Sequence, residues 1–591
     1  MRRAFALGLV LLGVVACRRD KDTTSAFPRH ETLYIGGPQW GEASSFNPLA
    51  SSPDWPLKGM NLMYETLLVF DSQQGEMKPL LAESYRVTDE AVEVTLHEEA
   101  RFSDGSPVTA RDVKYTFDLG RRFKSLLLAP VWQFLTDVRV ADGHPRKVVF
   151  ALNPERLNPL VVLDSLQETY IVPAHVIEPL LVQSQQDINR FLKLKLDAGA
   201  VASGPYRLHS HSTEKIVAVR RDDYWGNQVF FGGKAAAPKY IVHPLYKSND
   251  HYSVALQQGR LDASSTFVPR IWLKHKKGVK SWYDTAPFFV PASIPTLFVN
   301  HLKKPLDDVH LRRAMAFSID YDDIRELAVS GYSEPLRPGL VLPFGVEKKY
   351  YSEQDAKKYG AGWHDPERAK AELQKGGYRS VWDDDGDLRE MRDASGKRVP
   401  TLFVKSPSGW TDWESVVRIA VRSMRAVGID ARERFIDASL FWNAVFGGDF
   451  DLIMFLPSPA PTPSKPWSRF ETILTSREWV PIGDKTYKNM GRFNKPGSPG
   501  YVARFDELLD SIPTLKDEKA LREAYRELNA LFMRYQPAIP LVYRPDQFYE
   551  FSSRAWTGFP TSEHPFLPPN IPGVRLGTRI LWHLEPASAV N

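Results

Sequence analysis

Apolar and polar positions along the chain follow two periods, one typical of strands and one typical of helices. Thr32–Ile35 is a short apolar run that ends at two glycines, and Val92–Leu96 alternates apolar and polar residues, so both segments are predicted to be strands. From Trp413 to Val427 apolar residues recur every three or four positions, which predicts a helix, and Lys516–Arg534 shows a helical pattern too. Strand and helix signals therefore alternate along the body of the chain.

Local signals mark where several helices begin. Thr109 and Asp112 form a variant of the capping box, and Asp365 followed by proline predicts a helix start that ends at Gly376–Gly377. Thr411–Glu414 is a full capping box, in which Thr411 is expected to be the N-cap residue.

Length and composition set the class of protein. The chain has 591 residues, too many for one ordinary core, so two or three domains are expected. Hydrophobic residues make up 43% and charged residues 25%, as in soluble globular proteins. A formal net charge of +5 over this length, without a long basic run, argues against a nucleic-acid partner.

The N-terminus carries a targeting pattern. Two arginines precede the apolar run Ala4–Ala16, which is too short to span a bilayer and is typical of a signal peptide, predicted here for residues 1–16. The run ends at Cys17, the only cysteine, in a context that resembles a bacterial lipobox. We therefore expect Cys17 to be lipidated, residues 17–30 to form a tether, and the protein to be extracytoplasmic and anchored to the membrane.

The search for catalytic chemistry finds no established motif. The chain has no Gly-x-Ser-x-Gly elbow, no His-Glu-x-x-His and no phosphate-binding loop. The histidines lack metal-ligand spacing, and Asp383–Asp387 has its glycine at the wrong position for a calcium loop. No metal and no cofactor are expected.

A series of motifs, in a fixed order, resembles family 5 of the extracellular solute-binding proteins, which includes oligopeptide- and dipeptide-binding proteins. The resemblance runs from about residue 31 to about residue 580 and rests on these segments: Pro79–Tyr85, Phe102–Val113, Gly204–Tyr206, Arg220–Gly226, Leu256–Asp262, Val299–His301 and Asp308–Asp320.

The resemblance implies an α/β protein with a two-lobed periplasmic-binding-protein (Venus-flytrap) fold and an additional small domain. Residues 31–70, 203–297 and 530–585 would form the first lobe, 71–202 the extra subdomain and 298–529 the second lobe. Hinge strands would let the lobes close on a ligand. The implied partners are the permease and ATPase subunits of an ABC importer, and the protein would be a monomer and not an enzyme. Two rival classes remain for testing: a secreted hydrolase, which would turn over its ligand, and a purely structural lipoprotein, which would bind none.

The ligand class is inferred from one segment. In peptide-binding members, an aspartate soon after a Gly-x-Tyr/Phe-Asp strand holds the α-ammonium of the peptide, because a buried ammonium needs a counter-charge. Here Gly448–Asp451 marks the strand, but the following segment, Leu452–Phe470, contains no Asp or Glu.

Other segments resemble the branch that binds cellobiose and related β-linked oligosaccharides: Gly409–Trp413, Pro466–Phe470, Asn489–Phe493 and Trp556–Pro560. An oligosaccharide is therefore the preferred ligand, a peptide is the alternative, and other small solutes remain open. Sugar rings stack on aromatic planes and their hydroxyls need polar partners, which makes Trp467 and Arg469 candidate ligand-binding residues.

Four further residues are candidates. Trp410 is expected just before the helix N-cap, without an apolar partner at Ser415, and so could project into a cleft. Trp413 lies on the apolar stripe of the same helix, which favours core packing. Trp40 follows the first strand, where ligand crevices form in α/β sheets, and Asn300 ends the strand signal before it.

Overall fold

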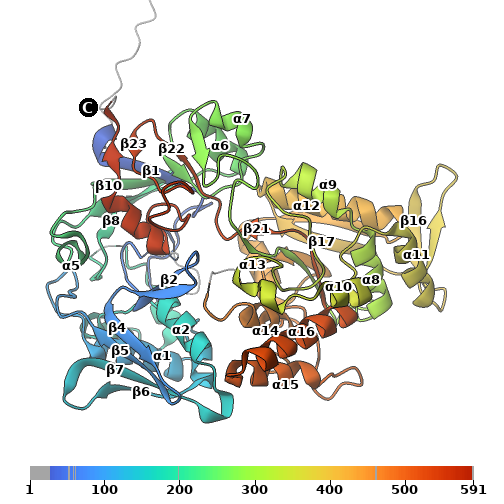
Figure 1. Cartoon of the computed structure of the whole chain (residues 1–591), viewed down its shortest axis with the longest axis horizontal. Helices are drawn as coiled ribbons and strands as arrows, with labels where there is room; N and C mark the ends of the chain where they lie inside the picture. Colours follow the sequence, from blue (N-terminus) through green and yellow to red (C-terminus); the bar gives the residue numbers. More distant parts are fainter. Residues whose placement is uncertain are drawn as a thin grey trace, which may run out of the picture.

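The computed structural model describes residues 27–50, 54–57, 59, 61–197, 199–458 and 462–588. The predicted signal peptide and Cys17 lie outside the described residues. The described chain gathers into three main sheets with helices packed around them (Figure 1). The α/β class predicted from the sequence is confirmed. Within the described residues, no helix combines the length and the apolar character needed to cross a membrane.

A mixed seven-stranded sheet forms the base of the first lobe, in the order β12-β22-β11-β1-β10-β9-β8. The central strand, β1 (Thr32–Gly36), pairs in parallel with β10 and β11, and its Leu33 and Ile35 are fully buried. The other strands are β8 (Tyr206–His211), β9 (Lys215–Arg220), β10 (Tyr240–Pro244), β11 (Ala263–Ser264), β12 (Val279–Ser281) and β22 (Glu550–Ser552). The helices α5 (Gly226–Phe231), α6 (Asn249–Gln257) and α7 (Trp272–His275) belong to the same lobe.

An antiparallel four-stranded sheet, β4-β5-β7-β6, forms the extra subdomain at the lower left of Figure 1. Its strands are β4 (Ala82–Val87), β5 (Ala91–Leu96), β6 (Leu135–Ala141) and β7 (His144–Leu152). The alternation on β5 buries Val92, Val94 and Leu96. The helices are α1 (Ala110–Arg122), α2 (Pro159–Glu168) and α3 (Ala174–Gln183). Thr109 caps α1 in the predicted capping box with Asp112.

The second lobe is built on a five-stranded sheet, β18-β17-β19-β14-β20. Its strands are β14 (Thr296–Val299), β17 (Leu402–Pro407), β18 (Ala431–Ile436), β19 (Leu452–Phe455) and β20 (Ala538–Pro540). Its helices include α8 (Val309–Ser318), α11 (Pro366–Lys375), α12 (Thr411–Ala426), α13 (Ala438–Gly447), α14 (Trp467–Leu474) and α16 (Glu518–Tyr535). Asp365 caps α11 as predicted. The hairpin β15 (Arg379–Trp382) and β16 (Leu388–Arg392) projects at the far right of Figure 1.

Two short strands connect the lobes. The chain crosses from the first lobe to the second through β13 (Pro291–Ser293) and returns through β21 (Arg544–Pro545), and these strands pair antiparallel. β20 comes before the hinge strand β21 and pairs with β14 of the second lobe, whereas residues 530–585 were predicted to belong to the first lobe. The difference arises because β20 has only three residues, too few to show a strand period, and directly follows α16.

Candidate ligand-binding site

A cavity of about 600 Å³ lies between the extra subdomain and the second lobe. One wall comes from residues 127–134 and from α2. The opposite wall comes from the start of α12, from α13 and α14, and from residues 487–490. Arg575, from the C-terminal part of the chain, also lines the cavity. This volume lies within the range of about 300–1,000 Å³ usual for small-molecule sites.

Aromatic side chains gather on the second-lobe side of the cavity. Trp442 and Phe446 are four residues apart on α13, so they share one face of the helix, and their rings stack with centroids 5.9 Å apart. Phe446 lies 4.7 Å from Tyr487, and Trp442 lies 5.6 Å from Phe455. Together with Trp410 these four residues line the cavity, and we call the five the aromatic wall. All except Phe455 are half-buried, so their rings remain accessible to a ligand.

Trp410 differs from the sequence expectation in its partners. It is itself the N-cap residue of α12, and Thr411 is the first helical residue. The predicted reciprocal capping does not form; instead the Glu414 carboxylate accepts from the backbone N–H of Gly409 at 2.8 Å. The Trp410 ring packs edge to face on Trp413 at 4.9 Å, so the expectation that it has no local partner is wrong. It still lines the cavity.

Trp413 and Trp467 also contact the cavity, but both rings are almost fully buried. Trp413 is 1% exposed and lies on the apolar stripe of α12. Trp467 begins α14, donates its indole N–H to the carbonyl oxygen of Leu509 at 2.7 Å, and packs edge to face on Phe134 across the cleft at 6.1 Å. Both therefore support the wall from behind more than they offer a stacking surface.

Trp40 lies beside the cavity and is not among the residues that line it. Its ring contacts Tyr252 at 5.1 Å and Trp410 at 6.1 Å. Gly36, at the end of β1, leaves room for the Tyr252 ring, which a Cβ at this position would approach to 2.5 Å. Trp40, which follows the first strand, thus lies at the border between the lobes.

Asn300 and Arg469 are placed away from the cavity, contrary to their prediction as ligand contacts. Asn300 is fully buried and donates its amide hydrogens to the carbonyl oxygens of Gly448 (2.8 Å) and Phe450 (2.9 Å), which fixes the turn before β19. Arg469 points away from the cavity on α14, is fully buried, and forms a two-pronged ion pair with Glu347 at 2.8 and 3.0 Å. The Asn300 amide and the two terminal guanidinium nitrogens of Arg469 bond to internal partners and are not offered to a ligand.

Two acidic residues face the cavity from the last turn of α2. Asp164 accepts from the backbone N–H of Ser464 at 3.3 Å and from the Ser464 hydroxyl, a contact that joins the subdomain to the second lobe. Burial, reinforced by Glu168, raises the pKa of Asp164 to about 8. Among the described residues, no hydrogen bond or ion pair within 4 Å reaches the Glu168 carboxylate, which is accessible from the cavity. Desolvation by the surrounding protein raises its pKa.

Further polar contacts hold the two walls together. The Arg156 guanidinium of the subdomain donates to the Glu471 carboxylate of α14 at 3.1 Å, and Lys488 lies 3.0 Å from the same carboxylate. The Gln133 side-chain amide donates to Glu478 at 2.6 Å. These bonds cross between the subdomain and the second lobe, and Trp40 of the first lobe contacts Trp410 of the second, so the structure has the lobes closed around the cavity.

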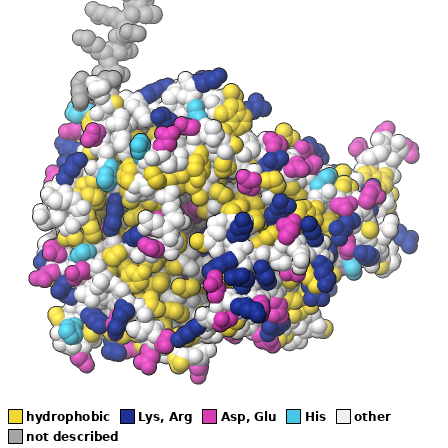
Figure 2. Space-filling model, viewed as in Figure 1, with side chains coloured by type: hydrophobic (Ala, Val, Ile, Leu, Met, Phe, Trp, Pro, Cys, Tyr) yellow, Lys and Arg dark blue, Asp and Glu magenta, His cyan; other side chains and the backbone are white. Residues whose placement is uncertain are grey.

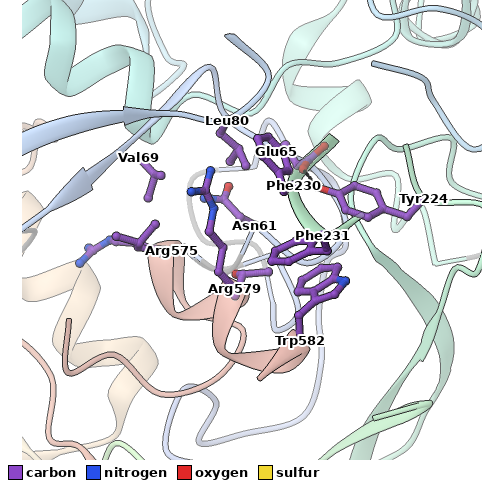
Figure 3. Close-up of a pocket in the computed structure, with 12 residues that line it drawn as sticks. Asn61, Glu65, Val69, Leu80, Tyr224, Phe230, Phe231, Arg575, Arg579 and Trp582 are labelled. Carbon is purple, nitrogen blue, oxygen red and sulfur yellow. Dashed lines mark hydrogen bonds between the residues drawn. The ribbon is translucent and has the colours of Figure 1, made fainter. Parts of the chain in front are cut away.

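A second, much smaller cavity lies in the first lobe beside Glu65 (Figure 3). Glu65 accepts from the Tyr224 hydroxyl at 2.6 Å and from the Trp225 indole N–H at 3.1 Å. Burial raises the pKa of Glu65 to about 7, although these hydrogen bonds oppose the shift. The cavity volume is about 20 Å³, enough for one water molecule and far too small for a sugar ring.

Sequence reasoning missed four of the residues that shape the site: Trp442, Phe446, Asp164 and Glu168. In each pair the spacing of four residues on a helix was a usable signal, because it places both side chains on one face. Within the described residues, no group of three or more His, Cys, Asp or Glu side chains could hold a metal ion.

Comparison with known families decides the identity of the chain. The family described as "Bacterial extracellular solute-binding proteins, family 5 Middle" matches residues 76–479. The chain is a family 5 extracellular solute-binding protein. It is thus a substrate-binding protein of the ABC transporter class, and the relatives described next are named as binding proteins.

Two curated relatives and one solved structure show the range of this family 5 protein's similarities. A probable peptide-binding protein, YejA, from Agrobacterium fabrum is 23% identical over 86% of this chain and 84% of its own length. A probable D,D-dipeptide-binding periplasmic protein, DdpA, from Escherichia coli is 24% identical over 78% of this chain and 80% of its own. The periplasmic oligopeptide-binding protein of Thermotoga maritima, solved with bound mannohexaose, is 28% identical, with a TM-score of 0.84 over 95% of this chain and all of its own.

Proposed function

We propose that this protein is the lipid-anchored, extracytoplasmic binding component of an ABC importer and that its cleft captures an oligosaccharide, β-linked in our hypothesis, by hinge closure. The ligand is then delivered to the permease, and the ATPase subunits drive its import. The observation that carries the proposal is the aromatic wall facing the 600 Å³ cavity.

The aromatic wall suits the apolar faces of sugar rings. If one ring covers roughly 100 Å² of apolar surface, about 25 cal/mol per Å² gives about 2.5 kcal/mol per stacked ring. Trp442 and Phe446 stack with an interplanar angle of only 19°, so they present nearly parallel planes along α13. The structural relative with bound mannohexaose supports this ligand class.

Calorimetric titration with β-linked di- to hexasaccharides, together with mannohexaose, tests the proposal. We expect one saturable site per chain without product formation, and Trp442→Ala should weaken binding by about 1–3 kcal/mol, the scale of one lost aromatic contact. Trp382→Ala is the matched control, because Trp382 is 43% exposed on the distant β15–β16 hairpin. Turnover of any saccharide would instead favour the hydrolase alternative.

A peptide is the second candidate, and Glu168 is the observation that favours it. The acid-free segment Leu452–Phe470 lacks the usual partner for a peptide ammonium, but Glu168 offers a carboxylate from the opposite wall. No described residue contacts it in an ion pair, although the charges of Arg575, Lys488 and Lys465 act on it from farther away. A ligand ammonium beside it would gain a charge-assisted hydrogen bond in a protected site. The relatives named as peptide-binding support this alternative.

Glu168→Gln separates the two candidates. A peptide with a free N-terminus should lose most of its affinity with this variant, and acetylation of the peptide should have the same effect in the unchanged protein. The hydroxyls of a neutral saccharide can form hydrogen bonds with the glutamine amide as well as with the glutamate carboxylate, so the affinity for a saccharide should change little in this variant. Its affinity should also depend little on salt. Binding of peptides alone would overturn the oligosaccharide proposal.

A further inference from the structure

The surface around α7 exposes apolar side chains in an unusual setting. Trp272 is 40% exposed and Leu273 is 47% exposed. One face of the Trp272 ring stacks on Phe288 with centroids 5.7 Å apart, so the ring is held in place while its other side meets solvent. A fixed, half-exposed tryptophan beside an exposed leucine loses little conformational entropy when another apolar surface covers it.

Positive charge predominates in the segment around these two residues, although Asp284 lies close enough to His275 of α7 to oppose the lowering of its pKa by burial. From residue 263 to residue 283 the chain contains five basic residues and no acid. Four of them are exposed: Arg270, Lys276, Lys277 and Lys280. Asp284 is the acid that follows this segment. Figure 2 shows hydrophobic and Lys/Arg side chains together along the upper edge of the molecule, above the region of α6 and α7 in Figure 1. We call Trp272, Leu273 and these four basic residues the α7 patch.

Sheet register fixes where the α7 patch lies. β1 and β11 run parallel, and Arg29, just before β1, donates to the Asp262 carboxylate, just before β11, at 2.9 Å. Arg554, just after the antiparallel strand β22, donates to the carbonyl oxygen of Lys277 at 2.6 Å. The start of the described chain and the basic end of the α7 patch therefore share one edge of the seven-stranded sheet. Trp40 and the ligand cavity lie beyond the other edge, where β1 ends.

Building on the proposed function, we propose that the α7 patch rests on an anionic membrane surface between rounds of ligand delivery to the permease, with the cleft then on the side away from the bilayer. Basic side chains are attracted to anionic lipid headgroups, by about 1 kcal/mol for each Lys or Arg at the surface. Tryptophan and leucine bury their apolar parts at the boundary of headgroups and acyl chains. The patch offers both features at once, and its basic end lies on the edge from which the chain leads toward its N-terminus.

The length of the chain between Cys17 and Phe27 and the lysines of the α7 patch favour a bilayer over a protein partner. Phe27 lies ten positions after Cys17, and at about 3.5 Å per position this stretch of chain spans at most about 35 Å. An anchor at Cys17 would therefore keep this edge within reach of the lipid surface. A protein interface depletes lysine at its core, whereas three of the four exposed basic residues here are lysines.

Sedimentation with lipid vesicles tests the proposal. The full chain carrying Cys17→Ser is mixed with vesicles of neutral phosphatidylcholine or with vesicles that also contain phosphatidylglycerol. Three versions are compared: the unchanged patch, Trp272→Ser with Leu273→Ser, and Lys276→Gln with Lys277→Gln and Lys280→Gln. All share one N-terminus, so differences in binding report the patch. The changed side chains are exposed, and circular dichroism with melting curves verifies that each variant is folded.

We expect binding to the anionic vesicles to exceed binding to neutral vesicles and to weaken with salt. The triple lysine variant should lose on the order of 100-fold in affinity and the apolar variant about tenfold. Trp382→Ser, which removes a similarly exposed tryptophan beside Asp383–Asp385, should bind like the unchanged chain. Equal binding to both vesicle types, or an equal loss with Trp382→Ser, would overturn the proposal. Absent vesicle binding combined with weaker stimulation of the importer's ATPase by the Trp272 variant would instead identify the patch as a protein-docking surface.

Discussion

Trp40 of the first lobe and Trp410 of the second lobe meet with ring centroids 6.1 Å apart and planes tilted by 43°. Backbone contacts support them, because the N–H of Asn249 donates to the carbonyl oxygen of Gly409 at 3.4 Å and its side-chain amide donates to Asp412 at 3.1 Å. The two tryptophans thus mark a point where the lobes touch. Their contact depends on the lobes being closed, since the two residues belong to different lobes between which the chain passes at the hinge strands β13 and β21.

The tryptophan contact gives an optical signal for closure. Addition of a ligand that favours the closed state should change the emission of Trp40 and Trp410, and Trp40→Phe should reduce this change while leaving affinity within a few-fold. Small-angle scattering should show a smaller radius of gyration with saturating ligand. An unchanged radius together with a fluorescence change would place the effect at the ligand and not in hinge motion.

The Arg156–Glu471 ion pair allows a second test of lobe closure, by mutation. Both side chains are largely buried, 15% and 6% exposed, and they join the subdomain to the second lobe. Arg156→Met should lower the affinity for the ligand about tenfold, because the closed state loses a charge-assisted bond while Glu471 keeps Lys488. Calorimetry measures the loss, and scattering of the ligand-saturated variant shows whether the closed form is depleted.

The matched control is a second ion pair between the same two parts of the molecule. Lys516 and Asp89 lie 2.9 Å apart but are 79% and 82% exposed. Exposed pairs contribute little because water and salt screen them. Lys516→Met should therefore leave affinity unchanged, and an equal loss with both variants would contradict a specific role for Arg156.

Much of the architecture could be predicted from the sequence, because each prediction rested on short-range chemistry. The Thr109 capping box, the Asp365 start of α11 and the buried stripe of α12 form as expected, since each depends on residues within one or two helical turns. The position of β20 could not be predicted, because its three residues gain their partner, β14, from more than 230 positions away.

The candidate site was harder to predict, because it is assembled from side chains far apart in the chain. Trp410 could be inferred from its place at a helix start, but its contact with Trp40 depends on how the lobes close. Arg469 was predicted as a ligand contact from its chemistry, and only the fold shows that its guanidinium is paired with Glu347. Glu168 was overlooked because its spacing of four residues from Asp164 shows only that the two share a helix face, and the fold alone shows that this face borders a cavity.

Asn300 is expected to act in stability and not in binding. Asn300→Ala removes two donors to buried carbonyl oxygens and the acceptor for the backbone N–H of Leu302, so buried polar groups lose their partners. The expected loss is about 1–3 kcal/mol. Urea unfolding should show a lower midpoint, while ligand affinity measured well below that midpoint stays unchanged. A loss of affinity without a loss of stability would restore Asn300 as a ligand contact.

Membrane attachment is expected to depend on Cys17. Cys17→Ser should shift the protein from the membrane to the soluble fraction of cells, because stable anchoring requires more than one acyl chain and the α7 patch alone gives reversible contact. Fractionation followed by immunodetection measures the shift, with mass spectrometry of the unchanged protein to detect the acyl groups. Retention of the variant in salt-washed membranes would contradict the lipoprotein assignment.

The pH dependence of stability should report Asp164. Burial and the nearby Glu168 raise its pKa to about 8, well above the value of about 4 in an unfolded chain. Between these two values the folded state holds a proton that the unfolded state has released. Its contribution to stability is therefore largest below about pH 4 and falls as the pH rises to about 8.

Asp164→Asn replaces the protonated acid with a neutral side chain of the same shape, so this dependence should disappear. Melting curves between pH 5 and pH 9 should show the variant gaining stability over the unchanged protein as the pH rises, with the largest gain near pH 9. Asp89→Asn, at an exposed carboxylate, serves as the control and should give parallel curves. Parallel curves for Asp164→Asn as well would mean that Asp164 is already ionised at pH 5. Its two contacts from Ser464 would then stabilise the anion, and the interlobe bond would be indifferent to pH.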